Sequence, residues 1–167
     1  MAVRRFLASV SMLVLGVAAV ACGSANPADS FSVETSPESL EVDSGSTLRV
    51  SVTVANKTAD VVRIGRWWFE VEVLDMSGSR VWRSDFYVFP LPPTGSVLNK
   101  TEFEGGDTAN VSAHWDLTDD DNKPVQPGVY QIIGIVMVCP DPDNPDTFTC
   151  DRQEIADPTP AEITVVQ

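Results

Sequence analysis

The chain has 167 residues, of which 43% are hydrophobic and 21% are charged, and its formal net charge is −13 at pH 7. A strongly acidic protein is repelled by nucleic acid and by anionic lipid, so this charge argues against a nucleic-acid-binding protein. The part of the chain with core-forming character, about 130 residues, suits a single domain.

The first 21 residues have the layout of a secretory signal peptide. Arg4 and Arg5 supply the positive charge, an apolar run extends over Phe6–Ala21, and small residues lead into Cys22. The run is shorter than the ~20 apolar residues that a membrane-spanning helix needs. We therefore expect residues 1–21 to be removed, which changes the net charge from −13 to −15 through the loss of two arginines.

The end of this run, Ala19-Val20-Ala21-Cys22, resembles the lipobox of bacterial lipoproteins, with alanine at the position where leucine is commonest. The resemblance implies cleavage before Cys22 and a diacylglyceryl group on the cysteine sulfur. Each buried CH₂ contributes about 0.8 kcal/mol, so two or more acyl chains hold a protein stably on a membrane. We expect an extracytoplasmic protein, lipid-anchored to the bacterial cell membrane. The alternative is an ordinary signal peptide followed by a chance cysteine.

Residues 22–36 are rich in Ser, Pro, Ala and acidic residues and contain few large apolar ones. Such a composition buries too little surface to offset the chain entropy lost on folding. The sequence therefore predicts a lipidated N-terminus and flexible tether over residues 22–36 and one folded domain over residues 37–167. Phe31 and Val33 leave open a first edge strand within the tether.

Alternation of apolar and polar residues predicts the strands of the domain, because a period of two with β-branched residues is typical of half-buried strands. The predicted strands are Thr47–Ala55, Trp67–Leu74, Arg80–Phe86, Ala109–Leu117, Tyr130–Val138 and Ala161–Val166. Tyr130–Val138 is apolar on both faces, so we expect it to lie centrally in its sheet. No segment has a sustained helical period.

Short strands at regular spacing, joined by Gly and Pro turns, predict an all-β fold: an immunoglobulin-like antiparallel β-sandwich of about seven or eight strands. Tyr130 follows the turn Pro127-Gly128 at the start of the central strand. This is the placement of a tyrosine corner, in which the hydroxyl group bonds to nearby backbone.

Cys139 and Cys150 remain after Cys22. An even pair of cysteines outside the cell indicates a disulfide. The loop that this bond closes is short, and the chain-entropy model gives a stabilisation of roughly 3 kcal/mol.

Several motifs between about Leu48 and Val138 resemble the bacterial intracellular proteinase inhibitor (BsuPI) domain, first described in Bacillus. They are Gly78 with Val81-Trp82-Arg83-Ser84, then Trp115, then Pro127-Gly128-x-Tyr130 with Gly134. The resemblance implies an immunoglobulin-like sandwich and, more distantly, protease inhibition. The founding members act inside cells, whereas this chain is predicted to be exported, and no inhibitory motif can be carried over residue by residue.

The sequence lacks a recognisable catalytic set, so we predict that the protein is not an enzyme and holds no cofactor. His114 is the single histidine, no G-x-S-x-G motif accompanies it, and a type I copper site needs two histidines. We expect His114 on the surface. Two acidic clusters offer oxygens for calcium but lack EF-hand spacing, which favours solvated turns. They are Asp116 with Asp119–Asn122, and Asp141, Asp143, Asn144 and Asp146.

Candidate partner-binding residues are Trp68, Pro92, Pro93 and Asp143. One of the adjacent residues Trp67 and Trp68 must face outward in a strand, and an exposed aromatic ring often marks a recognition surface. The alternative is that Arg80 or the segment Pro90–Pro93 covers Trp68. The prolines and Asp143 belong to two proline-stiffened loops, Pro90–Ser96 and Pro140–Thr149, and stiffness lowers the ordering cost of binding.

These observations predict a membrane-anchored lipoprotein whose sandwich is a non-enzymatic protein-binding or accessory module. The partners are the membrane, through lipid on Cys22, and an unidentified protein. The alternative function is inhibition of an extracytoplasmic serine protease through a proline-stiffened loop. The oligomeric state is open at this point.

Overall fold

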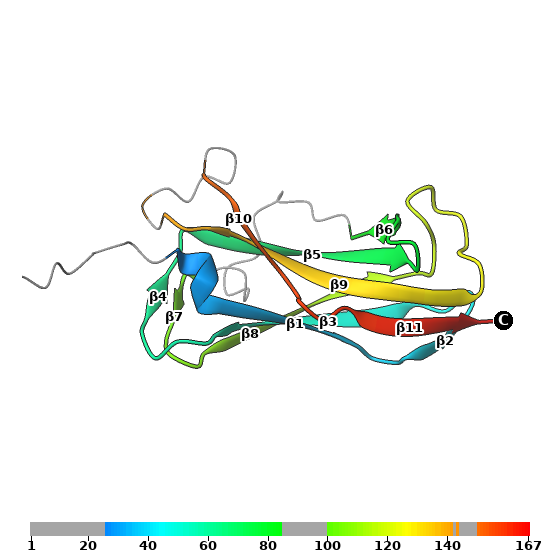
Figure 1. Ribbon diagram of the computed structural model, residues 1–167, viewed down its shortest axis with the longest axis horizontal. Coiled ribbons are helices and arrows are strands. Elements are labelled where there is room, and N and C mark those ends of the chain that lie inside the picture. Colours follow the sequence, from blue (N-terminus) through cyan, green and yellow to red (C-terminus); the bar gives the residue numbers. More distant parts are fainter. Residues whose placement is uncertain (1–25, 85–99, 142, 144–149) are drawn as a thin grey trace, which may run out of the picture.

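The structure is a computed structural model that describes residues 26–84, 100–141, 143 and 150–167. Figure 1 shows an elongated molecule built mainly of strands. In chain order its elements are η1 (Pro27–Ser30), β1 (Phe31–Pro37), β2 (Glu41–Asp43), β3 (Leu48–Asn56), β4 (Val62–Arg63), β5 (Arg66–Asp75), β6 (Arg80–Arg83), β7 (Glu102–Phe103), β8 (Thr108–Trp115), β9 (Gly128–Cys139), β10 (Gln153–Ala156) and β11 (Ala161–Val166). None of the described helices is long and apolar enough to cross a membrane.

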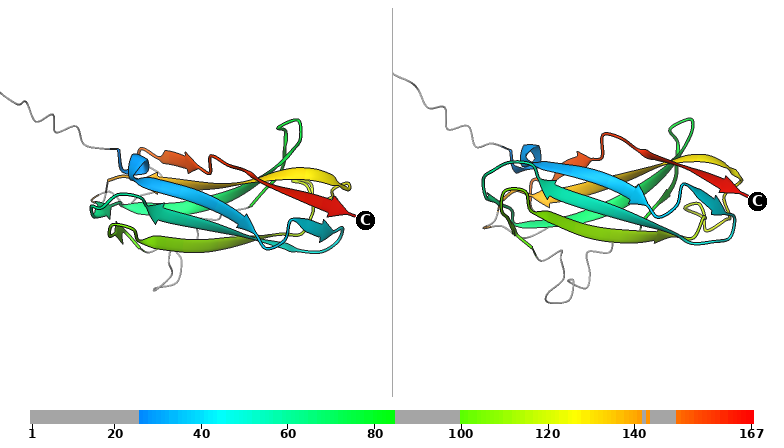
Figure 2. Two further views of the ribbon diagram at one scale, coloured as in Figure 1. Left: turned by 60° about the horizontal axis from the view of Figure 1, so that its bottom comes forward. Right: turned by 90° about the horizontal axis from the view of Figure 1, so that it is seen from below.

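Two sheets pack face to face, as the views in Figure 2 show. One sheet has the order β1-β3-β8 and is antiparallel. The other has the order β2-β11-β9-β5-β6, and β10 pairs with the same edge of β9 as β11 does. The short strands β4 and β7 form a separate pair. The predicted all-β immunoglobulin-like sandwich is confirmed, with additional strands of two to four residues.

The long strands lie where the alternating pattern predicts them. In β3, Leu48, Val50, Val52 and Val54 are buried, and the residues between them are less buried or exposed. In β5, Trp67, Phe69, Val71 and Val73 are buried. Strand β9 lies centrally, between β5 on one edge and β10 and β11 on the other. The strand predicted over Arg80–Phe86 corresponds to β6, and its last two residues lie outside the described residues.

The flexible tether predicted for residues 22–36 is wrong from Pro27 onward. Asn26 caps η1, because its side-chain oxygen accepts the Ala28 N–H at 3.1 Å. Strand β1 then pairs with β3 along its whole length, and its residues alternate between buried and exposed from Phe31 to Ser36. Phe31 and Val33 bury enough apolar surface against the core to order a segment that is polar on average. The folded domain therefore includes η1 and β1.

An aromatic cluster fills each end of the core. At the end that holds η1, β4 and β7, here called the η1 end, the Phe31 and Phe103 rings lie 5.1 Å apart, and Trp67 packs against Phe103 at 6.1 Å. At the opposite, C-terminal end, Trp115 lies 5.8 Å from Tyr130. The Tyr130 hydroxyl donates to the backbone oxygen of Gln126 at 2.6 Å, which confirms the tyrosine corner.

Candidate binding surfaces

The predicted disulfide is present. Cys139, at the end of β9, is bonded to Cys150, and their Cα atoms lie 5.7 Å apart. Cys139 is fully buried and Cys150 is half-buried. The bond therefore joins the end of the central strand to the segment that leads into β10.

Trp68 does not form an exposed binding platform, and the alternative, a covered Trp68, describes its burial. That it binds a partner stays a prediction. Its side chain points to the outer face of its sheet, as expected, but it is only 5% exposed. Met137 lies directly opposite on β9, and Ile135 on the same face is also buried. The outer face of the sheet is apolar at this point, and little of the indole is exposed there.

The structure describes some of the other predicted site residues and leaves the rest outside the described ranges. Pro92 and Pro93 lie outside the described residues, and so does Cys22. Asp143 is exposed, and its backbone N–H donates to Asp141 Oδ1 at 2.9 Å. His114 is exposed on β8, on the face that looks away from the core.

The first acidic cluster is held by bonds within the chain. Asp119 Oδ1 accepts the backbone N–H groups of Asp121 and Lys123, both at 2.9 Å. Asp116 accepts the hydroxyl of Thr47 at 2.7 Å. Within the described ranges, no three His, Cys, Asp or Glu side chains are grouped to hold a metal ion. The loop has the internal bonding of a structured turn.

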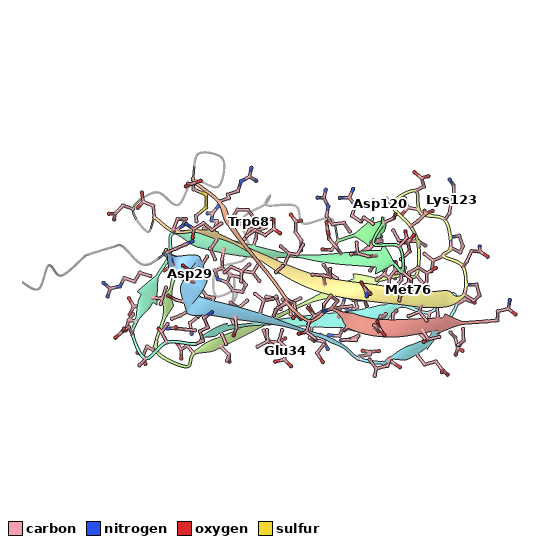
Figure 3. All side chains as sticks on the ribbon, in the orientation of Figure 1. Asp29, Glu34, Trp68, Met76, Asp120 and Lys123 are labelled. Carbon is pink, nitrogen blue, oxygen red and sulfur yellow. A yellow bond between two sulfur atoms is a disulfide. The ribbon has the colours of Figure 1, made fainter. Side chains whose placement is uncertain are left out.

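The C-terminal end carries two exposed apolar side chains among these acids. Met76, in the turn after β5, is 59% exposed, and Val129, at the start of β9, is 40% exposed. They are neighbours, because Asp75 and Tyr130, the residues next to them, are cross-strand partners. Figure 3 places Met76 at the same end as Asp120 and Lys123. This is a small apolar spot rather than a concave site.

A groove of about 610 Å³ lies between β1 and β10. Its floor includes the buried side chains of Phe31 and Val33, and its opposite wall is the segment from Gln153 to Ala156. Its rim carries Asp29, Lys57 and Glu154. Ligand sites commonly enclose about 300–1,000 Å³, so the groove is large enough to hold one.

Two hydrogen bonds join the segments that form the two walls of the groove. At the η1 end, the Ala28 N–H donates to Gln153 Oε1 at 3.4 Å. At the other end, the Thr35 N–H donates to Asp157 Oδ2 at 2.6 Å. Between these two contacts β1 and β10 are not paired with each other, because β1 belongs to one sheet and β10 to the other. The groove is thus a gap in the side of the sandwich where the two sheets meet.

The sequence could not reveal this groove. Its walls are the predicted tether and a four-residue strand, Gln153–Ala156, that has no clear alternation. The positions of the walls depend on β3 and β9, to which they are paired. The one available signal was the alternation of Phe31, Val33 and Thr35, which suggests a strand but not what lies beside it.

No protein-family model matches the chain, and no curated protein matches its sequence. Among solved structures, the C-terminal domain of Wzt is 10% identical, with a TM-score of 0.48 over 81% of this chain and 71% of that chain. A CARDB domain from Pyrococcus furiosus, in complex with di-metal ions, is 12% identical, with a TM-score of 0.43 over 81% of this chain and 87% of that one. A β-glucosidase from Erythrobacter marinus is 22% identical, with a TM-score of 0.42, over 82% of this chain but only 15% of the glucosidase. These likenesses concern the fold alone.

Proposed function

We propose that this protein is an extracytoplasmic lipoprotein, anchored to the bacterial cell membrane by acyl chains on Cys22. Its β-sandwich is a non-enzymatic module that binds a partner protein. The observation that carries the proposal is the position of the lipobox cysteine relative to the fold. The first described element begins at Pro27, and only residues 23–26 lie between Cys22 and that element in the sequence.

This short linker determines how the anchored domain would be oriented. Five Cα–Cα steps join Cys22 to Pro27, and an extended chain covers at most about 18 Å in that number of steps. The η1 end would therefore stay near the bilayer. The C-terminus lies at the opposite end of the sandwich (Figure 1), and so it would point away from the membrane.

A binding role is supported by the groove between β1 and β10. It is a concave site with charged side chains at its rim and apolar ones on its floor. A mixed lining of this kind is suited to a ligand that presents both polar and apolar groups. With Cys22 in the membrane, the groove would lie on the membrane-proximal half of the domain, within reach of other membrane-attached proteins.

Membrane fractionation with mass spectrometry of the mature N-terminus tests the anchor. In the wild type we expect a membrane-bound protein that begins with acylated Cys22. The variant Cys22→Ala should leave the membrane fraction, whereas Ser24→Ala, a neighbouring change of similar size, should stay in it. A soluble wild-type protein whose N-terminus lies elsewhere would overturn the proposal.

A further inference from the structure

The wall of the groove formed by β1 presents backbone groups that have no partner in the described structure. The backbone N–H of Thr35 donates to Asp157, so the backbone N–H and C=O groups of Thr35 point away from β3. The direction of the backbone N–H and C=O groups alternates from one residue to the next along a strand. The backbone groups of Phe31 and Val33 therefore point to the same side as those of Thr35. The Phe31 N–H is used by η1, where it donates to the Ala28 oxygen. The groups left without a hydrogen-bond partner in the described structure are the N–H of Val33 and the carbonyl oxygens of Phe31, Val33 and Thr35.

The wall formed by β10 is built in the same way. The Asp157 N–H donates to the Gly134 oxygen on β9 at 2.9 Å, which sets the orientation of the strand. By the same alternation, the backbone groups of Gln153 and Ile155 point toward β9. The backbone groups of Glu154 and Ala156 point away from β9. The N–H and C=O groups of Glu154 and Ala156 thus form a second free strand edge beside the groove.

Two free edges of this kind favour an extended peptide as the occupant. An unpaired edge strand is a template for another strand, because main-chain hydrogen bonds supply affinity independently of sequence. From Phe31 to Thr35 the β1 edge is about 13 Å long, which suits roughly four extended residues. Side chains on one face of such a segment would lie on the apolar floor formed by Phe31, Val33 and Ile155.

The charged side chains around the groove indicate which charge a bound peptide should carry. The rim carries two carboxylates, Asp29 and Glu154, against one ammonium group, Lys57. Glu34 adds a further exposed carboxylate on β1, and Figure 3 shows Asp29 and Glu34 on the side of the molecule that β1 occupies. The chain as a whole has a net charge of −13. A segment that carries Lys or Arg beside its extended core is therefore complementary.

We propose that the groove between β1 and β10 binds an extended, positively charged segment of a partner protein through backbone pairing. This inference rests on the proposed binding role and names the site and the class of partner. The partner strand adds to one or both free edges, and its basic side chains lie beside Asp29 and Glu154. Recognition then depends on extended conformation and charge more than on particular side chains.

A synthetic probe tests the proposal on the full-length chain in a non-ionic detergent. The probe is a short fluorescent peptide of alternating valine and threonine with a lysine at each end. We expect binding by fluorescence anisotropy, and changes in the NMR signals of the Val33, Glu154 and Ala156 amides. A peptide with glutamate in place of both lysines should bind more weakly. So should a peptide with N-methyl groups on alternate backbone nitrogens, because it has lost its donors.

A matched pair of variants isolates the backbone contribution. Glu154→Pro removes an N–H that does not bond to β9, so the strand should tolerate it at this edge. Glu154→Ala removes the same carboxylate but keeps the N–H. We expect the proline variant to bind the probe about fivefold more weakly than the alanine variant, the effect of one hydrogen bond. Thermal unfolding of both variants checks that they are folded.

Three results would overturn the proposal: no binding of the probe to the wild type, equal affinity of the two variants, or NMR changes confined to the Met76 and Val129 region. If the proline variant does not fold, the binding of the N-methylated peptide to the wild type is the deciding measurement. If this peptide binds as tightly as the unmethylated probe, backbone pairing is rejected. Peptide binding is measured in detergent, so it does not depend on acylation. Failure of the groove and failure of the Cys22 anchor are therefore distinguishable.

Discussion

The backbone N–H of Thr35 donates to the Asp157 carboxylate at 2.6 Å, and this bond joins residues that are 122 positions apart in the sequence. The Thr35 hydroxyl in turn accepts the N–H of Gly134 at 2.8 Å. Asp157 also accepts the Thr159 N–H, at 2.9 Å, and is only 8% exposed. This buried network ties the edge strand of one sheet to the central strand of the other.

Removal of the Asp157 carboxylate should destabilise the fold. In Asp157→Ala, two backbone N–H groups lose their acceptor, and a buried donor without a partner costs about 1–3 kcal/mol. We expect a loss of that order in the free energy of unfolding, measured by urea denaturation. Asp151→Ala, at an exposed position near β10, is the matched control and should change stability little. Equal losses in the two variants would contradict the role assigned to the network.

The absence of a side chain at Gly134 is a packing requirement. A Cβ atom added there would lie 2.8 Å from Thr35 Oγ1 and 2.9 Å from Val52 Cγ2. Overpacking of this kind typically costs about 1–3 kcal/mol, so Gly134→Ala should lower the urea midpoint clearly. Gly128→Ala is the control, because its nearest neighbour would be 3.9 Å away. A Gly134→Ala protein as stable as this control would show that the two sheets can separate here without cost.

The sequence predicts the main strands because each of them carries its own periodic signal. Leu48 to Val54 and Trp67 to Val73 alternate over enough residues to establish both the strand and its buried face. The tyrosine corner is equally local, because Tyr130 and Gln126 are four positions apart. Strands β2, β4 and β7 have two or three residues, too few to show a period.

The candidate site could not be predicted because it depends on long-range pairing. Trp68 illustrates the limit, since alternation correctly assigns it to the outer face but does not show that this face is covered. The groove needs β1 at the edge of one sheet and β10 at the edge of the other. Neither position follows from the local sequence of Phe31–Pro37 or Gln153–Ala156.

Reduction of the disulfide should destabilise the domain without unfolding its central strand locally. Cys139 and Cys150 are separated by 11 positions, and the entropy model gives about 3 kcal/mol for a loop of this size. We expect the wild type to lose stability of that order when dithiothreitol is added during urea denaturation. Cys150→Ala should start at the lower value and show no response to the reductant. A response in that variant would point to a different origin of the effect.

Tyr130 should make stability depend on pH in the alkaline range. Burial, and then the negative charge of Asp75, raise the pKa of the Tyr130 phenol above its ordinary value. The folded protein therefore keeps the proton at a pH where the unfolded chain releases it. The stabilisation is complete below about pH 10, the unfolded value, and is lost as the pH rises through the folded-state pKa.

This dependence can be measured by urea denaturation between about pH 8 and pH 11. The free energy of unfolding should fall less steeply with pH in Tyr130→Phe than in the wild type. Asp75→Asn should lower the Tyr130 pKa, followed by the ultraviolet absorbance of the phenolate, because it removes the charge that opposes ionisation. An unchanged pKa in Asp75→Asn would leave burial as the sole cause.

The N-terminal strand pairs give the domain a defined response to mechanical load. Strand β1 is antiparallel to β3, and β2 runs parallel to β11, the last strand of the chain. Helix η1, the first described element, and the C-terminus lie at opposite ends of the sandwich (Figure 1). Tension between a fixed N-terminus and the C-terminal strand would therefore act along the strands. The β2–β11 hydrogen bonds would be loaded in shear. They would therefore have to break together, and would not be peeled apart one after another.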